Sequence, residues 1–160
     1  MNEEERLENL ALILEALGKA TGEDLRGNSF NSRLRIQKSI YLLKNLGYKP
    51  LSDYSFSNYL RGPYSPNLAD HYYKADTATF RLAKSPKIPA SMVDTIKKAL
   101  TRGLRFTEAA TTLHSTWKHN KGLSKEAIFS HVRKLKPYLG GELEGAWKFL
   151  EEAELVPGCT

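Results

Sequence analysis

The segment that most constrains the fold lies near residue 40, where the apolar residues of one helix point to two sides. The stretch NSRLRIQKSIYLLKNLGY starts at an Asn or Ser cap and stops at Gly47. At about 100° per residue, Ile36 and Ile40 fall on one side of this helix and Leu34 falls on another. A helix that is apolar on two sides must be covered on both, so we expect it at the centre of the molecule.

Apolar residues three and four positions apart predict helices along most of the remaining chain. The first is expected over residues 3–19, where Gly18 marks its end. Another begins with Ser65 as its cap and Pro66 at its first position, where no N–H is needed, and runs to about Lys74. Four more helices are expected in the second half, marked by apolar residues within 93–100, 106–117, 128–135 and 143–150.

A small amount of β structure is expected between the helices. Alternation of aromatic and apolar residues with others over residues 54–60 predicts a short strand that runs into the turn RGPYSP, and TFRLA at residues 79–83 is its expected partner strand. The prolines of KSPKIP at residues 84–89 mark a boundary. The predicted fold is therefore mainly α, a helical bundle with a small antiparallel β-hairpin, in which residues 1–88 and 89–160 pack as one compact unit.

The composition predicts a soluble protein with no membrane partner. Of the 160 residues, 41% are hydrophobic and 26% are charged, and no apolar run approaches the ~20 residues that cross a bilayer. The N-terminus MNEEERLENL is acidic where a secretory signal is basic and then apolar, so we expect a cytoplasmic location. The lone Cys159 excludes an internal disulfide and a cysteine-rich zinc site.

Charge is distributed unevenly along the chain. Residues 1–30 carry three basic and seven acidic side chains, residues 31–138 carry twenty and six, and residues 139–160 carry one and five. The net charges of the three segments are therefore −4, +14 and −4. The basic middle suits a polyanionic partner such as nucleic acid, and the alternative is that the acidic ends fold back onto it.

The sequence lacks the common patterns of catalytic and metal sites, so we expect no catalytic residues, no cofactor and no metal. The four histidines have no spacing that brings two ligands onto one helical turn beside a carboxylate. There is no glycine-rich phosphate loop and no G-x-S-x-G nucleophile elbow, and the only cysteine lies next to the C-terminal residue. A carboxylate pair that forms only in three dimensions stays open.

The C-terminal region combines a Ser124 cap, a helix, the turn KPYLGG and a second helix, which is compatible with a winged-helix-like part. In that fold the second helix enters the major groove of DNA. Here the second helix carries four glutamates, among them Glu144 and Glu151, against the single Lys148, and the phosphates of a duplex would repel it. We therefore expect this helix to face protein; the alternative is a plain helical pair that closes the core.

Basic residues elsewhere are better placed to contact phosphates. Lys98 and Arg102 lie four positions apart and so share one helical face. Solvated helix faces often carry such clusters, and a face without a partner is the alternative for each of them. The residues that we expect to contact nucleic-acid phosphates are Arg33, Arg35, Lys97, Lys98, Arg102, Arg133, Lys134 and Lys136.

Several blocks of the sequence resemble known families. RIQKSIYLLKNLGY, YLRGPYSPNLA, EAATTLHSTW and LKP followed by a final helix occur in this order. They are similar to the YwgA-like family of prokaryotic proteins and, more distantly, to the Panacea antitoxin domain, over most of residues 31–155. The resemblance implies a mainly helical fold with a small sheet, no known cofactor and no established catalytic residues. For the Panacea relatives it also implies a role in neutralising a partner protein.

The family motif positions fall on the central helix and on the turn after the first strand. The helix start at Ser65 offers unpaired N–H groups that attract an anion, and Arg61 beside it suits a two-point bond to a phosphate or carboxylate. In the alternative, Arg61 pairs within the protein, Ser65 only caps its helix, and Gln37 and Lys38 brace the turn. The residues of this candidate anion or partner site are Arg61, Tyr64, Ser65, Lys38, Gln37 and Tyr41.

Three functions follow from these features. The first hypothesis is a non-enzymatic regulatory or defence-related protein that binds nucleic acid through its basic middle segment. The second is an antitoxin-like module that binds a toxin-like or regulatory partner protein through its acidic ends or an apolar groove. The third is an enzyme or receptor for a small anion held by Arg61 and Lys38.

Overall fold

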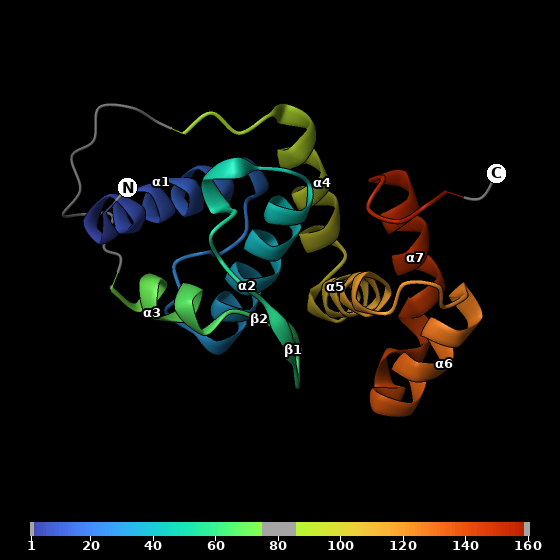
Figure 1. The fold of residues 1–160 in the computed structure, drawn as a ribbon. Coiled ribbons are helices and arrows are strands. Elements are labelled where there is room, and N and C mark those ends of the chain that lie inside the picture. The colour runs from blue at the N-terminus through green and yellow to red at the C-terminus, as the bar shows by residue number, and fades with distance from the viewer. Residues whose placement is uncertain (1, 75–85, 159–160) are drawn as a thin grey trace.

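The computed structural model describes residues 2–74 and 86–158 (Figure 1). These residues form seven α-helices, two short 3₁₀ helices and one two-stranded antiparallel sheet, which confirms the prediction of a mainly α fold with a small hairpin. The elements are α1 (Glu3–Thr21), α2 (Phe30–Asn45), η1 (Lys49–Leu51), β1 (Ser57–Tyr59), β2 (Gly62–Tyr64), α3 (Pro66–Lys74), α4 (Ala90–Thr101), α5 (Leu104–His119), α6 (Lys125–Leu135), η3 (Pro137–Glu142) and α7 (Leu143–Glu152).

Side-chain caps account for where several helices begin. The Asn2 side chain accepts a hydrogen bond from the backbone N–H of Glu5 at the start of α1. The Ser29 hydroxyl caps α2, which therefore begins earlier than the Asn31–Ser32 pair that the sequence suggests. The expected cap at Ser124 is present, since its hydroxyl accepts from the N–H of Ala127 at the start of α6.

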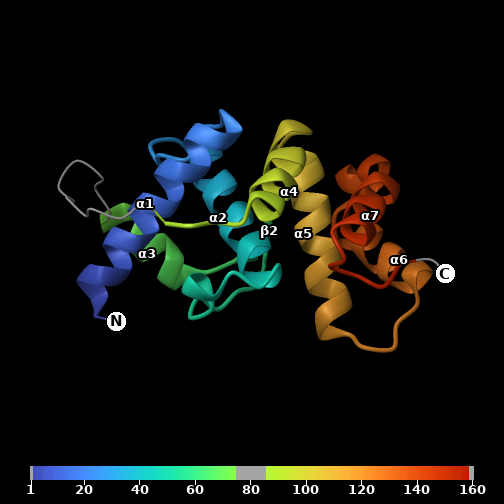
Figure 2. The same cartoon turned by 90° about the horizontal axis from the view of Figure 1, so that it is seen from above.

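Helix α5 lies between the two parts of the molecule. It contacts α2, α4 and both strands on one side, and α6, η3 and α7 on the other (Figure 2). The expected burial of α2 is confirmed, because every residue from Ile36 to Leu43 is buried. The apolar faces of α2 and α5 belong to one continuous core that also includes side chains from α1, α4 and α7.

The hairpin differs from the prediction in its second strand. Strand β1 pairs with β2 in the register Ser57 to Tyr64 and Tyr59 to Gly62, so residues 60 and 61 form the turn. The prediction of a turn over RGPYSP is therefore wrong at Gly62 and Pro63. Pro63 lies in β2, because a two-stranded sheet consists only of edge strands and an edge strand tolerates a residue without an N–H. The expected partner strand, TFRLA, lies outside the described residues.

Contacts cross the sequence boundary that the prolines suggest. Helix α4, the first helix after that boundary, packs against α1 and α2. Helix α7 packs along α5 and buries Trp147 and Leu150, as expected for a helix that closes the core. After Tyr64 the described part of the chain contains no strand that would form a wing. Within that part, no helix is both long and apolar enough to span a membrane.

Candidate functional site

Gln37 connects the central helix to the start of α3. Its side-chain amide donates to the backbone oxygen of Ser65 at 3.0 Å, and its side-chain oxygen accepts from the Ser65 N–H at 2.9 Å. The Ser65 hydroxyl accepts from the N–H of Leu68, which makes it the cap of α3. Both side chains are buried, so these contacts favour the bracing interpretation of Gln37 and Ser65.

Lys38 is fully enclosed beneath the hairpin turn. Its side chain is 1% exposed, and its ammonium group donates to the backbone oxygen of Arg61 at 2.5 Å. Burial lowers the pKa of Lys38 to about 8, against a smaller opposing effect of the Glu108 carboxylate. The sequence places Lys38 and Arg61 together correctly, but the contact uses the carbonyl of Arg61 and not its guanidinium.

Three further polar side chains lie under the same turn. Lys136 Nζ is 3.2 Å from Glu108 Oε2 and 3.4 Å from the backbone oxygen of Tyr59. The Tyr138 hydroxyl donates to the same Glu108 oxygen. Burial, and then the Glu108 carboxylate, raise the pKa of Tyr138 to about 12. We call Lys38, Glu108, Lys136 and Tyr138 the hairpin cluster, because their contacts hold both sides of the turn onto α2, α5 and η3.

Sequence reasoning finds only part of this cluster. Glu108 is isolated in sequence, and its partners Lys136 and Tyr138 follow 28 and 30 residues later, on the far side of α6. The available signal is a single acidic residue in the apolar and small-residue stretch FTEAATTL, which becomes a buried helix face. A buried carboxylate requires a cation or hydrogen-bond donors, so Glu108 itself implies such partners.

Tyr41 does not join the hairpin cluster. Its hydroxyl shares a 2.6 Å hydrogen bond with Nδ1 of His114 on α5, and both side chains are buried. Burial lowers the pKa of His114 to about 4 and raises the pKa of Tyr41. The pair is therefore neutral near pH 7 and joins α2 to α5.

The side chains of Arg61 and Tyr64 lie against aromatic rings at the hairpin. The guanidinium carbon of Arg61 lies 5.9 Å from the ring centroid of the exposed Phe30, and the Tyr64 ring lies edge-on against Tyr59 with centroids 5.2 Å apart. Arg61 is exposed and Tyr64 is partly buried. The six residues of the expected anion or partner site thus lie in four places, namely the Gln37–Ser65 brace, the hairpin cluster, the Tyr41–His114 pair and the surface of the hairpin.

An exposed aromatic and apolar surface surrounds Arg61. Leu60, at the tip of the hairpin, is 87% exposed, and large parts of Phe30 and Tyr59 also face solvent. Tyr59 and Tyr138 lie near each other because both contact the Lys136–Glu108 pair. We call this surface the hairpin face and define it as Phe30, Tyr59, Leu60, Arg61 and Tyr138.

The eight residues expected to contact phosphates do not share one surface. Arg35 pairs with Glu23 at 3.6 Å, and Lys136 is buried in the hairpin cluster. Arg133 lies over the ring of Phe129 on α6, with 5.6 Å between its guanidinium carbon and the ring centroid. Five of the eight do not line the cleft that the other three share, namely Arg33, Arg35, Arg133, Lys134 and Lys136.

The other three, Lys97, Lys98 and Arg102, line one cleft of about 730 Å³ together with Lys148. Two carboxylates, Asp94 and Glu152, also line this cleft, so its described lining has more positive than negative side chains. We call it the α4–α7 cleft, because five of the six charged residues lie in these two helices and the sixth, Arg102, is the C-cap of α4. Lys148 is not predicted from the sequence, because its own helix is acidic overall. Its part in a basic surface becomes visible only when α7 lies beside α4.

Arg102 lies against residues of two helices, α5 and α7. Its guanidinium carbon lies 3.9 Å from the ring centroid of Phe106 on α5. On α7, Gly145 leaves the space that the guanidinium occupies, because a Cβ at this position would lie 2.9 Å from Arg102 Nη2. Contact with a ring and a glycine thus orders an exposed arginine without neutralising its charge.

Comparison of the chain with protein-family models, with curated proteins and with solved structures finds no match. The resemblance to YwgA-like and Panacea proteins therefore stays a prediction.

Proposed function

We propose that this chain is a non-enzymatic, cytoplasmic regulatory or defence-related protein that binds nucleic acid through the α4–α7 cleft. The observation that carries the proposal is the convergence of Lys97, Lys98 and Arg102 with Lys148 on one cleft. The first three come from the basic middle segment, and Lys148 follows Arg102 by 46 residues in the sequence. Clustered cations on one concave surface suit a phosphate backbone.

The carboxylates of the cleft oppose this binding only weakly. Lys98 pairs with Asp94 at 3.1 Å, but both side chains are mostly exposed, and exposed pairs four residues apart contribute only about 0.3–0.5 kcal/mol. A phosphate can therefore replace Asp94 as the partner of Lys98 at little cost. Arg102 is already ordered by Phe106, so less side-chain entropy is lost when it binds a phosphate.

The proposal is tested by fluorescence anisotropy with labelled single-stranded and duplex oligonucleotides of mixed sequence. We expect binding whose log Kd depends linearly on log salt, with a slope of about 3 if three or four phosphates are contacted. Arg102→Ala should weaken binding by about tenfold, because it removes a charge-assisted contact. Absence of binding at low salt, for both kinds of oligonucleotide, would overturn the proposal.

A charge-matched control separates the cleft from general electrostatics. Lys148→Glu and Lys121→Glu change the net charge equally, but Lys121 lies in the exposed loop after α5 and outside the cleft. We expect Lys148→Glu to weaken binding much more than Lys121→Glu does. Equal effects of the two variants would place the nucleic acid elsewhere on the protein.

A second candidate function, an antitoxin-like module that binds a partner protein, is favoured by the hairpin face. Leu60 and its neighbouring aromatic residues form an exposed apolar group beside an arginine, a composition that is typical of interface hot spots. The test is co-purification of the tagged protein with a partner encoded by a neighbouring gene. Leu60→Glu should abolish it, whereas Leu123→Glu, another exposed leucine, should not.

A further inference from the structure

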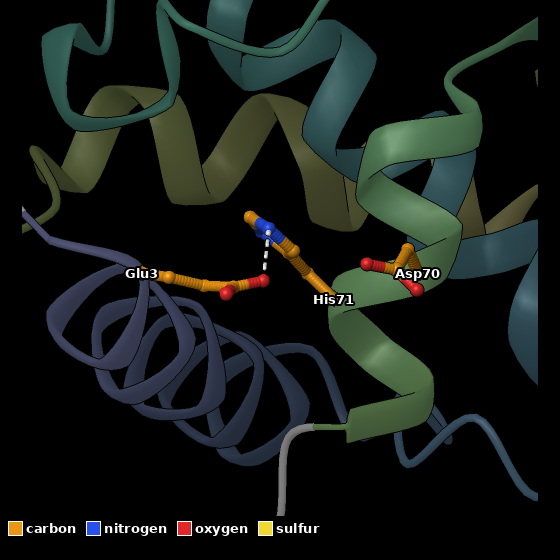
Figure 3. Close-up of side chains that lie close together, drawn as sticks. All are labelled: Glu3, Asp70 and His71. Atoms are coloured by element: carbon orange, nitrogen blue, oxygen red, sulfur yellow. Dashed lines mark ion pairs between the residues drawn. The ribbon is translucent and has the colours of Figure 1, made fainter.

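A histidine and two carboxylates meet where α1 approaches α3 (Figure 3). Glu3 comes from the first turn of α1, and Asp70 and His71 come from α3. One ligand atom of each residue lies within 4.8 Å of the others. The sequence does not indicate this group, because a search for ligands on one helical turn cannot pair residues that are 67 positions apart.

The His71 ring is fixed in one orientation. The side chain is only 4% exposed, and its Nδ1 shares a 2.7 Å hydrogen bond with the Tyr54 hydroxyl. With the proton on Nδ1, donated to the Tyr54 oxygen, Nε2 presents a lone pair towards Glu3. The distance from Nε2 to Glu3 Oε1 is 3.9 Å, too long for a hydrogen bond. Nε2 of this buried histidine therefore lacks a hydrogen-bond partner among the described residues.

An imidazole nitrogen and two carboxylate oxygens form a ligand set suited to a borderline divalent ion such as Zn²⁺. Ligand atoms at about 2.1 Å from the metal lie about 3.4 Å apart in a tetrahedral site. The Glu3 and Asp70 side chains are largely exposed and can move by the small distance required.

Lys74 already supplies positive charge to this group. Its ammonium lies 3.0 Å from Asp70 Oδ2 and 3.6 Å from Glu3 Oε1. The two carboxylates thus share one cation, and a metal ion must displace it. Because these ion pairs are solvent-exposed, they are weak, and the flexible lysine can withdraw.

We propose that Glu3, Asp70 and His71 bind one Zn²⁺ ion, with the Tyr54 hydroxyl orienting the histidine. The three side chains leave one tetrahedral position for water. This site is independent of the α4–α7 cleft and does not depend on nucleic-acid binding. A metal that binds only the folded chain also joins the N-terminal end of α1 to α3 and so raises the melting temperature.

The test measures Zn²⁺ affinity of the full chain by competition with a chromophoric chelator. Wild type should bind one ion per chain, and Glu3→Gln and Asp70→Asn should each weaken binding by at least about tenfold. Glu4→Gln, at the next position of the same helical turn, is the matched control and should leave the affinity unchanged. His131→Gln controls for adventitious binding by an exposed histidine.

Lys74→Gln provides a test with the opposite sign. If the ammonium competes with the metal, its removal should tighten Zn²⁺ binding. If the ion pair is purely structural, Lys74→Gln should change the stability and leave the Zn²⁺ affinity unchanged. The proposal fails if wild type shows no saturable binding at millimolar Zn²⁺. It fails equally if Glu3→Gln and Asp70→Asn bind as wild type does, because the ion then lies elsewhere.

Discussion

The ammonium group of Lys38 lies in a space between α2 and the hairpin that almost no solvent reaches. Its folded-state pKa of about 8 is below the ordinary value of 10.5. Between these two values the unfolded chain holds a proton that the folded chain has released, so the free energy of unfolding should rise with pH. Lys38 therefore makes the protein's stability depend on pH in the alkaline range.

We predict that the free energy of unfolding of wild type rises by about 2 kcal/mol from Lys38 alone as the pH increases from about 7.5 to about 9.5. Lys38→Met should remove this part of the rise, which urea unfolding at a series of pH values would measure. Lys97→Met, which removes an exposed lysine, should keep the wild-type slope. An unchanged slope in Lys38→Met would show that the folded-state pKa is ordinary.

The Tyr41–His114 pair gives a second residue-scale prediction. Tyr41→Phe keeps the ring but leaves Nδ1 of the buried His114 without this partner, which should lower the free energy of unfolding by about 1–3 kcal/mol. The matched control is Tyr73→Phe, since Tyr73 is exposed and its loss of a hydroxyl should cost nothing measurable. Chemical unfolding at pH 7 compares the two, and equal stabilities would contradict the role of the buried bond.

At this scale the sequence predicts which residues matter better than it predicts what they contact. Gln37, Lys38 and Arg61 are marked correctly as neighbours of the turn. The side chains of Gln37 and Lys38 bond backbone atoms of Ser65 and Arg61, and a sequence pattern does not show whether a partner is a side chain or a backbone group. Glu108 and Tyr138 escape prediction because their positions depend on how α5 and η3 pack.

At the scale of elements, the hairpin depends on Gly62. Its φ of 105° is in the left-handed region, and a Cβ there would lie 3.2 Å from Thr112 Oγ1 and 3.3 Å from Thr111 Oγ1. We predict that Gly62→Ala lowers the free energy of unfolding by about 2 kcal/mol or more, from strain and from separation of the hairpin from α5. Gly140→Ala is the control for chemical unfolding, because its Cβ would contact nothing within 4 Å.

Helix α7 gives a prediction in which stability and binding change separately. The Cβ of Gly145→Ala displaces only the end of the flexible Arg102 side chain, so the melting temperature should stay the same or rise slightly. Nucleic-acid affinity should fall by about the same factor as in Arg102→Ala, roughly tenfold. Anisotropy and thermal unfolding of both variants test this, and wild-type affinity in Gly145→Ala would show that the position of Arg102 is unimportant.

Most elements are predictable because caps and apolar spacing are local. The Ser65–Pro66 start of α3 and the Ser124 cap of α6 are present as predicted. Strand β2 is not predictable in this way, since three residues with glycine and proline have no strand pattern. Its place depends on long-range packing, because Lys38, Thr111 and Thr112 lie close to Gly62 and a Cβ there would make tight contacts with the two threonine hydroxyls.

At the scale of the whole molecule, α5 joins two sets of helices into one core. We therefore predict a single cooperative unfolding transition. Both tryptophans, Trp117 and Trp147, lie on α5 and α7, so their fluorescence reports on the C-terminal part, whereas circular dichroism reports on all helices. Leu17→Ala, in the fully buried part of α1, should lower both midpoints equally, with a cost of about 2–5 kcal/mol.

Separate midpoints for the two probes in Leu17→Ala would show that the N-terminal helices unfold independently. Thr95→Ala, a change on the partly buried side of α4, serves as a mild control for the same measurement.

The sequence indicates a boundary near its cluster of prolines, whereas packing of α4 on α1 and α2 connects the chain across that point. Prolines restrict the backbone locally, so their positions do not predict which helices pack together over long distances in the sequence.

The shared position of α5 also suggests where the chain tolerates a cut. Residues 120–124 between α5 and α6 are all exposed, whereas the elements after them lie against α5. If the chain were cut in this loop, the first piece would expose the side of α5 that α6, η3 and α7 cover in the intact protein. The two pieces are therefore suited to fragment complementation. If each piece is fused to one half of a reporter protein, reassembly of the two pieces would bring the reporter halves together.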